Sequence, residues 1–197
     1  MTTITPTPSV SPPRTGVMIG IATITMSFAA YTSAMVVRQS SGADWQAIPL
    51  PPILYFNTLV LLASSATFVI GRRRLAASWA TGASEPAASP AAPGMTWLYL
   101  TLGLGLLFLA GQVLAWRALA GQGLYVATTP NSGFFYVLTA LHALHLLGGV
   151  AALLYLIGRL TRGSGPTPVN ALGAVSLYWH FMDVLWIYLL LILATRL

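Results

Sequence analysis

The 197-residue sequence contains no cysteine, no lysine and only three acidic residues, Asp44, Glu85 and Asp183. Without cysteine the chain can form no disulfide, no thiolate metal site and no Cys-x-x-Cys-His haem attachment. We also find no phosphate-binding loop, no nucleophile beside a base and no paired carboxylates. Any redox metal would therefore rest on histidine or methionine, and we expect no catalytic residue in this chain.

Charge is scarce throughout the chain, whereas long apolar runs are abundant. Charged residues make up 6% of the sequence and hydrophobic residues 56%, and the mean hydropathy is +0.78. A soluble domain has a charged content of about 25%, so the composition indicates an integral membrane protein. The net charge of +6 comes from nine arginines. In a membrane chain such a surplus indicates topology, and we expect no nucleic-acid partner.

Five apolar runs are long enough to span a bilayer, which requires about 20 mostly apolar residues for each helix. We predict an all-α polytopic membrane protein with a single domain at 16–197, in which five transmembrane helices form a bundle. The helices are expected at about 16–38, 51–71, 95–118, 133–158 and 169–195. The Thr/Pro/Ser-rich tail at 1–15 and the Ala/Pro/Ser-rich linker at about 75–94 cannot bury a core, so we expect flexibility in the first and disorder in the second.

The arginines predict the orientation of these helices. With five spans, six arginines lie on the N-terminal side and three on the other, so the positive-inside rule puts the N-terminus in the cytoplasm and the C-terminus outside. An arginine-only basic set with abundant Ala, Gly and Pro also suggests the codon usage of a GC-rich bacterium, and hence the bacterial plasma membrane. The six arginines on the N-terminal side are Arg14, Arg72, Arg73, Arg74, Arg159 and Arg162, and the three on the opposite side are Arg38, Arg117 and Arg196.

Ionisable residues occur in the last two apolar runs, although charge near a bilayer centre is costly. His142 and His145 are three positions apart, as are His180 and Asp183, so each pair projects from nearly one helix face. At 1.5 Å per residue, all of them fall near mid-membrane depth in antiparallel helices. They could meet if these two helices are neighbours.

Three interpretations of this intramembrane cluster compete. One is a haem site, in which His180 and a histidine of the preceding helix ligate iron from opposite faces. Another is a proton relay or transport site at which Asp183 titrates with a histidine. The third is structural: Asp183 is neutralised by a histidine and hydroxyls and fixes the packing of the last two helices. The sequence favours the structural interpretation, and Asn57, Gln112, Thr139 and Ser176 are similarly expected to form interhelical hydrogen bonds.

Four segments in order resemble a known family. "FFYVLTALHALHLLGG", followed about 30 residues later by "YWHFMDVLWIYLL", resembles the last two helices of subunit III of the haem-copper oxygen reductases, the cytochrome c and quinol oxidases. Upstream, "LPPILYFNTLVLLASSAT" and "LGLLFLAGQVLAW" resemble the two preceding helices of that subunit. The resemblance runs from about Arg14 to the end and implies a short, five-helix form without the first two helices of the long form.

The resemblance implies a non-catalytic subunit III of a terminal oxidase in aerobic respiration. Such a subunit packs on subunit I, lies in a complex with subunit II and small subunits, and supports stability, lipid binding and proton uptake during oxygen reduction. It binds no haem and no copper, which belong to its partner subunits, whereas bound phospholipid is expected. By this analogy His142, His145, His180 and Asp183 match the family's polar positions and build the interior of the subunit.

One departure from the family pattern concerns a mid-membrane glutamate in its first shared helix. Ile24 stands at or next to that position here, and no acid lies between Arg14 and Arg38. Any proton-related role of that carboxylate is therefore absent or moved. Two other hypotheses stay open at this stage: a homologous subunit of a nitric oxide reductase system, and an autonomous membrane cytochrome b or ion carrier.

Overall fold

The computed structural model describes residues 12–42, 44, 45, 47–80, 93–162 and 169–196. Within these residues the chain forms five α-helices and no strand. All five are long and apolar enough to cross a membrane, which confirms the predicted all-α, multi-pass architecture. The helices are α1 (Pro12–Ser41), α2 (Ile53–Ala80), α3 (Pro93–Ala120), α4 (Pro130–Arg162) and α5 (Val169–Arg196).

The helices extend further than the apolar runs that predict them. α1 begins at Pro12, inside the predicted tail, and α2 continues through the first six residues of the predicted linker to Ala80. Arginine and alanine are strong helix formers, so the segment after Gly71 stays helical although it is not apolar. A 28-residue helix is about 42 Å long, which matches a bilayer with its headgroup regions. Residues 1–11 and 81–92, where most of the tail and linker lie, are outside the described residues.

Local sequence signals fix the connection between α3 and α4. After α3 ends at Ala120, Gly123 adopts a left-handed φ of 78°, a conformation that favours glycine and lets the chain reverse. α4 then begins with a proline at its first position. The Ser132 backbone N–H donates to the Thr129 hydroxyl at 3.2 Å, and the Thr129 N–H donates to the Ser132 hydroxyl at 3.1 Å. This reciprocal cap satisfies N–H groups that a helix start leaves unpaired.

At the other end of α1, polar contacts tie the chain to the end of α5. Arg38 donates to both carboxylate oxygens of Asp44, at 2.8 and 2.7 Å. This hydrogen bonding holds the pKa of Asp44 below its usual range. The side chains of Gln39 and Trp45 donate to the Arg196 carbonyl at 3.2 and 3.0 Å, which satisfies one of the carbonyls left unpaired where α5 ends.

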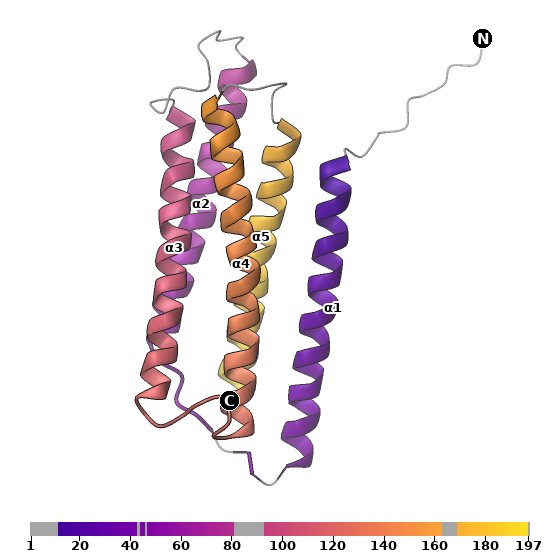
Figure 1. The fold of residues 1–197 in the computed structure, drawn as a ribbon, viewed down its shortest axis with the longest axis vertical. Helices are drawn as coiled ribbons and strands as arrows, with labels where there is room; N and C mark the ends of the chain where they lie inside the picture. Colours follow the sequence, from indigo (N-terminus) through magenta and orange to yellow (C-terminus); the bar gives the residue numbers. More distant parts are fainter. Residues whose placement is uncertain (1–11, 43, 46, 81–92, 163–168, 197) are drawn as a thin grey trace, which may run out of the picture.

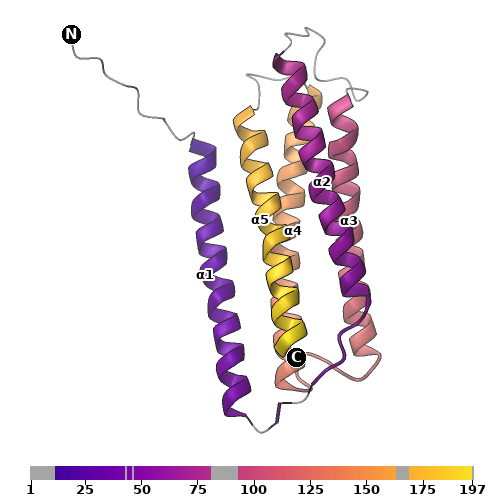
Figure 2. The ribbon, with the colours of Figure 1, turned by 180° about the vertical axis from the view of Figure 1, so that it is seen from behind.

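The five helices form a four-helix core with one helix at its edge. α2 and α3 form an antiparallel hairpin with the most extensive contact in the bundle, and α4 and α5 pack against α3 and α2 respectively (Figures 1 and 2). α1 lies at the edge, chiefly against α5. Because successive helices alternate in direction, the starts of α1, α3 and α5 lie at the same end as the finishes of α2 and α4 (Figure 1).

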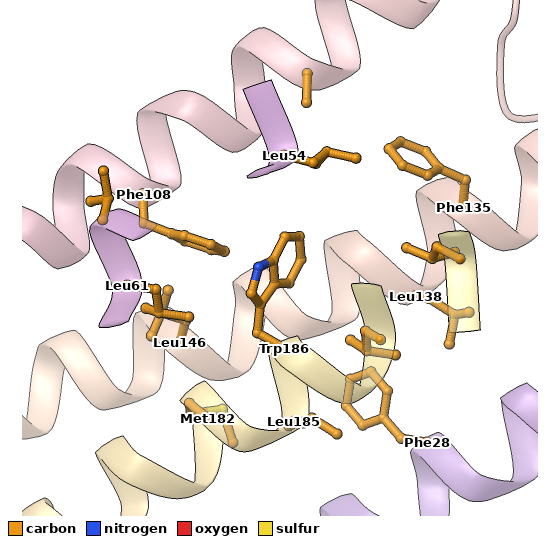
Figure 3. Close-up of a cluster of buried hydrophobic side chains, with 14 of the residues drawn as sticks. Phe28, Leu54, Leu61, Phe108, Phe135, Leu138, Leu146, Met182, Leu185 and Trp186 are labelled. Atoms are coloured by element: carbon orange, nitrogen blue, oxygen red, sulfur yellow. The ribbon is translucent and has the colours of Figure 1, made fainter. Parts of the chain in front are cut away.

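Aromatic side chains fill the centre of the bundle. Trp186 of α5 is fully buried, and its ring lies edge-on to Phe108 of α3 with centroids 4.8 Å apart (Figure 3). Leucines of α2 and α4 and Phe28 of α1 converge on the same cluster. A second buried cluster lies nearer the end of the bundle where α3 and α5 begin, and in it Trp179 packs against Phe68. Side chains from all five helices therefore meet in the interior.

Candidate functional site

The acidic group of the interior, Asp183, lies in the middle of α5. About 20 Å of helix separates it from either end of α5, and the residue is 4% exposed. Its ionisable neighbour is His180, whose Nδ1 lies 3.8 Å from Asp183 Oδ2. That separation is too long for a hydrogen bond, and within the described residues neither carboxylate oxygen has a hydrogen-bond partner.

His180 connects this carboxyl group to α2. Its Nδ1 and the hydroxyl of Ser65 share a hydrogen bond of 2.6 Å, in which the donor depends on the imidazole tautomer. Phe68, one turn further along α2, lies with its ring centroid 6.1 Å from that of His180. A buried charge is tolerated when it has a partner of opposite charge. A protonated His180 would be such a partner for the carboxylate of Asp183. The geometry therefore joins α5 to α2 through an imidazole and a hydroxyl.

His142 of α4 lies elsewhere, in the aromatic core. It is fully buried, and its ring lies 5.1 Å from Trp186 and 5.9 Å from Phe108, measured between centroids. Neither of its ring nitrogens has a hydrogen-bond partner in the described part of the chain. His142 therefore packs as a ring of α4 against aromatic side chains of α3 and α5.

His145 faces a third direction, towards α1. Its ring centroid is 5.9 Å from Phe28 of α1, and its Nδ1 is 2.7 Å from the Leu141 carbonyl of its own helix. Its backbone carbonyl accepts a hydrogen bond of 2.9 Å from the Tyr178 hydroxyl of α5. The position thus contributes to both the α1 and the α5 contacts of α4.

The four predicted cluster residues do not form a single constellation. Across the described ranges, no hydrogen bond, ion pair or ring contact joins His142 or His145 to His180 or Asp183. No group of three or more His, Cys, Asp or Glu side chains within those ranges could hold a metal ion. His142 lies against the rings of Trp186 and Phe108, whereas His180 lies against Ser65 and Phe68, so the two histidines of the haem interpretation have different neighbours.

The two predicted interhelical amides differ in their contacts. Asn57 of α2 donates to the Phe108 carbonyl of α3 at 3.5 Å, and it lies so close to Gly111 that a side chain there would collide with it. Gln112 of α3 is buried, but neither atom of its amide has a hydrogen-bond partner within the described ranges. The interhelical hydrogen bond predicted for Gln112 is therefore not formed with any of the described residues.

Both predicted hydroxyls lie between helices. Thr139 of α4 accepts a hydrogen bond of 3.0 Å from the indole of Trp116 of α3. Ser176 of α5 accepts one of 3.3 Å from the guanidinium of Arg72 of α2. Ile24 of α1 is buried in the core cluster.

Sequence reasoning missed several hydroxyl and indole contacts that hold helices together. Trp186 donates from its indole to the Thr58 hydroxyl of α2 at 3.0 Å, and the hydroxyls of Thr32 and Tyr188 link α1 to α5 at 2.9 Å. Thr67 and Thr101 link α2 to α3 at the same distance. Threonine and tyrosine are common in apolar helices, so nothing in the sequence singled these positions out. Such hydrogen bonds stabilise membrane helix pairs by about 0.6–2 kcal/mol each.

The fold and these groups define a class: a five-helix membrane protein whose buried polar side chains mostly contact neighbouring helices. Comparison with known proteins is more specific. The family description "Cytochrome c oxidase subunit III" matches residues 15–195, nearly the whole chain. The chain belongs to the cytochrome c oxidase subunit III family, and the resemblance seen in its sequence is thereby confirmed.

Curated relatives agree with this family. The chain is 34% identical over 167 residues to a probable cytochrome c oxidase subunit 3 of Mycobacterium tuberculosis, covering 82% of this chain and 75% of the relative. A probable cytochrome c oxidase subunit 3 of Nocardia farcinica is 31% identical over 178 residues, covering 87% and 82% of the two chains. The cytochrome c oxidase subunit 3 of Thermostichus vulcanus is 33% identical over 147 residues, covering 71% and 65%.

Proposed function

We propose that this chain is the non-catalytic subunit III of a haem-copper terminal oxidase that reduces oxygen in aerobic respiration. The observation that carries the proposal is the family match along nearly the whole chain, together with relatives that are named cytochrome c oxidase subunit 3. The complex lies in the bacterial plasma membrane. The N-terminus faces the cytoplasm, as the surplus of arginines on that side of the bundle favours.

The division of labour within the complex is the one that membership of the family implies. Haem and copper reside in partner subunits, with subunit I in direct contact with this chain and subunit II and small subunits nearby. The histidines support this assignment because His142 packs among aromatic rings while His145 and His180 point to different helices. The chain itself supplies packing surface, lipid contacts and support for proton uptake by subunit I.

The intramembrane pair of His180 and Asp183 has a structural role in this proposal. Its support is the hydrogen bond between His180 and Ser65, which makes the pair part of the α2–α5 contact. Ile24 stands at or next to the position of the family's glutamate, and no acid lies between Arg14 and Arg38, so α1 offers no carboxylate that could exchange protons. The stability of the oxidase during turnover then depends on the packing of α5 against α2, rather than on a titrating group in α1.

The test is deletion of this gene in its host, followed by oxygen uptake by isolated membranes with a saturating electron donor. We expect the haem bands of the oxidase to remain and the initial rate to be retained. The rate should then decline faster during sustained turnover than in the parent strain, and a plasmid copy of the gene should restore it. An unchanged time course of oxygen uptake, together with loss of nitric oxide consumption, would contradict the proposal and favour a nitric oxide reductase.

A further inference from the structure

Side-chain contacts join α3 to α4 at successive levels of the bundle. Nearest the finish of α3, the Tyr136 hydroxyl donates to the Trp116 carbonyl at 3.0 Å. Further into the bundle, the Trp116 indole donates to the Thr139 hydroxyl, also at 3.0 Å. At the next level the rings of Phe108 and His142 pack with their centroids 5.9 Å apart. These contacts fix which parts of the two antiparallel helices lie opposite each other.

Gln112 lies between these contacts on the face of α3 that meets α4. Trp116, one helical turn after it, bonds to α4, and Gly105, two turns before it, also faces α4. An added Cβ at Gly105 would lie 3.9 Å from Cγ2 of Val150. Gln112 itself is 1% exposed, so its amide points into the bundle. It therefore faces the stretch of α4 that contains His142.

Four buried polar atoms at this level have no hydrogen-bond partner within the parts of the chain that the structure describes. They are the amide oxygen and nitrogen of Gln112 and the two ring nitrogens of His142. An unpaired buried polar group lowers the ratio of folded to unfolded protein by roughly 5- to 150-fold. The large majority of such groups in folded proteins have a partner for this reason. Each of these two side chains therefore needs a ligand that the other does not supply directly.

A water molecule matches the chemistry of both side chains. The amide offers one acceptor and two donors, and a neutral imidazole offers one acceptor and one donor. Water donates two hydrogen bonds and accepts two, so it bridges the amide to a ring nitrogen in either tautomer of His142. The rings that pack against His142, those of Phe108 and Trp186, are uncharged, which favours a neutral ligand over an ion.

Two buried alanines lie at the same level. Ala143 follows His142 in α4, and Ala115 lies about one turn beyond Gln112 in α3. Methyl groups at these positions leave more space between the helices than leucines would, and a water occupies about 30 Å³ in the liquid. The residues at this level therefore suit a small polar guest better than a tight apolar contact.

We propose that Gln112 and His142 bind a buried water molecule that links α3 to α4 inside the membrane-spanning bundle. The water is hydrogen-bonded to the Gln112 amide on one side and to a His142 ring nitrogen on the other. It continues the polar contacts that Trp116 makes nearer the finish of α3, so polar groups join the two helices at consecutive levels. The site lies within this chain alone, so it does not depend on the proposed function.

The first test is a structure of the purified complex at a resolution that shows ordered waters. We expect a water peak at about 2.7–3.2 Å from both the Gln112 amide and a His142 ring nitrogen. A direct hydrogen bond between the two side chains would overturn the proposal, as would a hydrogen bond from either of them to another subunit. Well-defined side chains with no water peak between them would overturn it too.

A substitution cycle in the full-length chain measures whether the two side chains act together. Gln112→Met keeps the length of the side chain but removes the amide. His142→Phe keeps an aromatic ring against Trp186 but removes both nitrogens. The control is Gln122→Met, the same change at an exposed position in the turn after α3. Unfolding by sodium dodecyl sulfate in mixed micelles is followed by circular dichroism.

We expect each single substitution to lower the ratio of folded to unfolded protein about tenfold, because the remaining polar group loses its bridge. The double variant should resemble a single variant, since both partners are then apolar. The control should stay within about twofold of the unsubstituted chain. Single effects that multiply to about 100-fold in the double variant would mean that the residues act independently, and would overturn the proposal. If a substitution prevents folding, the water peak in the unsubstituted complex decides.

Discussion

Gly105 and Gly103 provide a matched pair of substitutions that tests the packing of α3 against α5. An added Cβ at Gly105 would lie 2.9 Å from Cη2 and 3.1 Å from Cζ2 of Trp179, whereas a Cβ at Gly103 would meet nothing within 4 Å. Carbon atoms in contact normally lie about 3.5–4.0 Å apart, so Gly105→Ala requires a shift of about 0.6 Å. Trp179 is fully buried against Phe68 and has little room to move.

The two substitutions share one term and differ in another. Both replace glycine by alanine in α3, which favours the helix by about 1 kcal/mol. Only Gly105→Ala adds overpacking, which costs about 1–3 kcal/mol in a well-packed core. The free energy of unfolding should therefore be about 1–3 kcal/mol lower for Gly105→Ala than for Gly103→Ala, and Gly103→Ala should equal or exceed the unsubstituted protein.

The assay is reversible unfolding in mixed detergent micelles with increasing sodium dodecyl sulfate, followed by far-ultraviolet circular dichroism. The difference between the two variants is the quantity of interest, since it cancels the shared helix propensity. Equal unfolding free energies for Gly105→Ala and Gly103→Ala would refute the close contact between α3 and Trp179.

Three further predictions concern polar contacts. A double-mutant cycle with Trp186→Phe and Thr58→Val should give a coupling energy of about 0.6–1.7 kcal/mol in the same unfolding assay, and a coupling near zero would mean that the 3.0 Å hydrogen bond does not link α5 to α2. Arg38 holds the pKa of Asp44 low, so the ion pair makes a small contribution to stability above the unfolded-state pKa of about 3.9, and this contribution is lost as pH falls through the folded-state pKa of Asp44. The Asp44→Asn variant should therefore be slightly less stable than the unsubstituted protein at pH 6 and equally stable at pH 2. A difference that persists at pH 2 would contradict this prediction. Asp183→Asn should loosen the complex during purification, measured by the recovery of partner subunits, while every haem absorbance band is retained; loss of a band from an intact complex would show that the residue acts on a haem.

The helices could be predicted from the sequence better than their ends could. Five apolar runs separated by polar or proline-rich segments leave one arrangement of spans, because each run is long enough to cross a bilayer once. The end of α2 could not be placed by hydropathy, since three arginines interrupt the apolar run after Gly71 although the chain stays helical to Ala80. Helix propensity and the packing of Leu75 in the second buried cluster favour this extension of α2, and neither appears in a hydropathy pattern.

The polar interior was only partly predictable. His180 and Asp183 are three positions apart on one helix, so their proximity follows from helical geometry. Ser65 as the partner of His180 does not follow, because nothing in the sequence says which helix α5 packs against. His142 and His145 have the same spacing but face different neighbours, the aromatic core and α1, since two side chains three positions apart diverge by about 60° around the helix.

We expect this chain to carry no haem and to accompany subunits that do. The chain should be tagged, purified in mild detergent, and examined by its dithionite-reduced minus oxidised spectrum before and after it is stripped from its partners. We predict haem a or haem b bands in the intact preparation that leave with a large partner subunit, and a colourless isolated chain. Bands that stay with the isolated chain would contradict the account and would make His142, His145 or His180 an iron ligand.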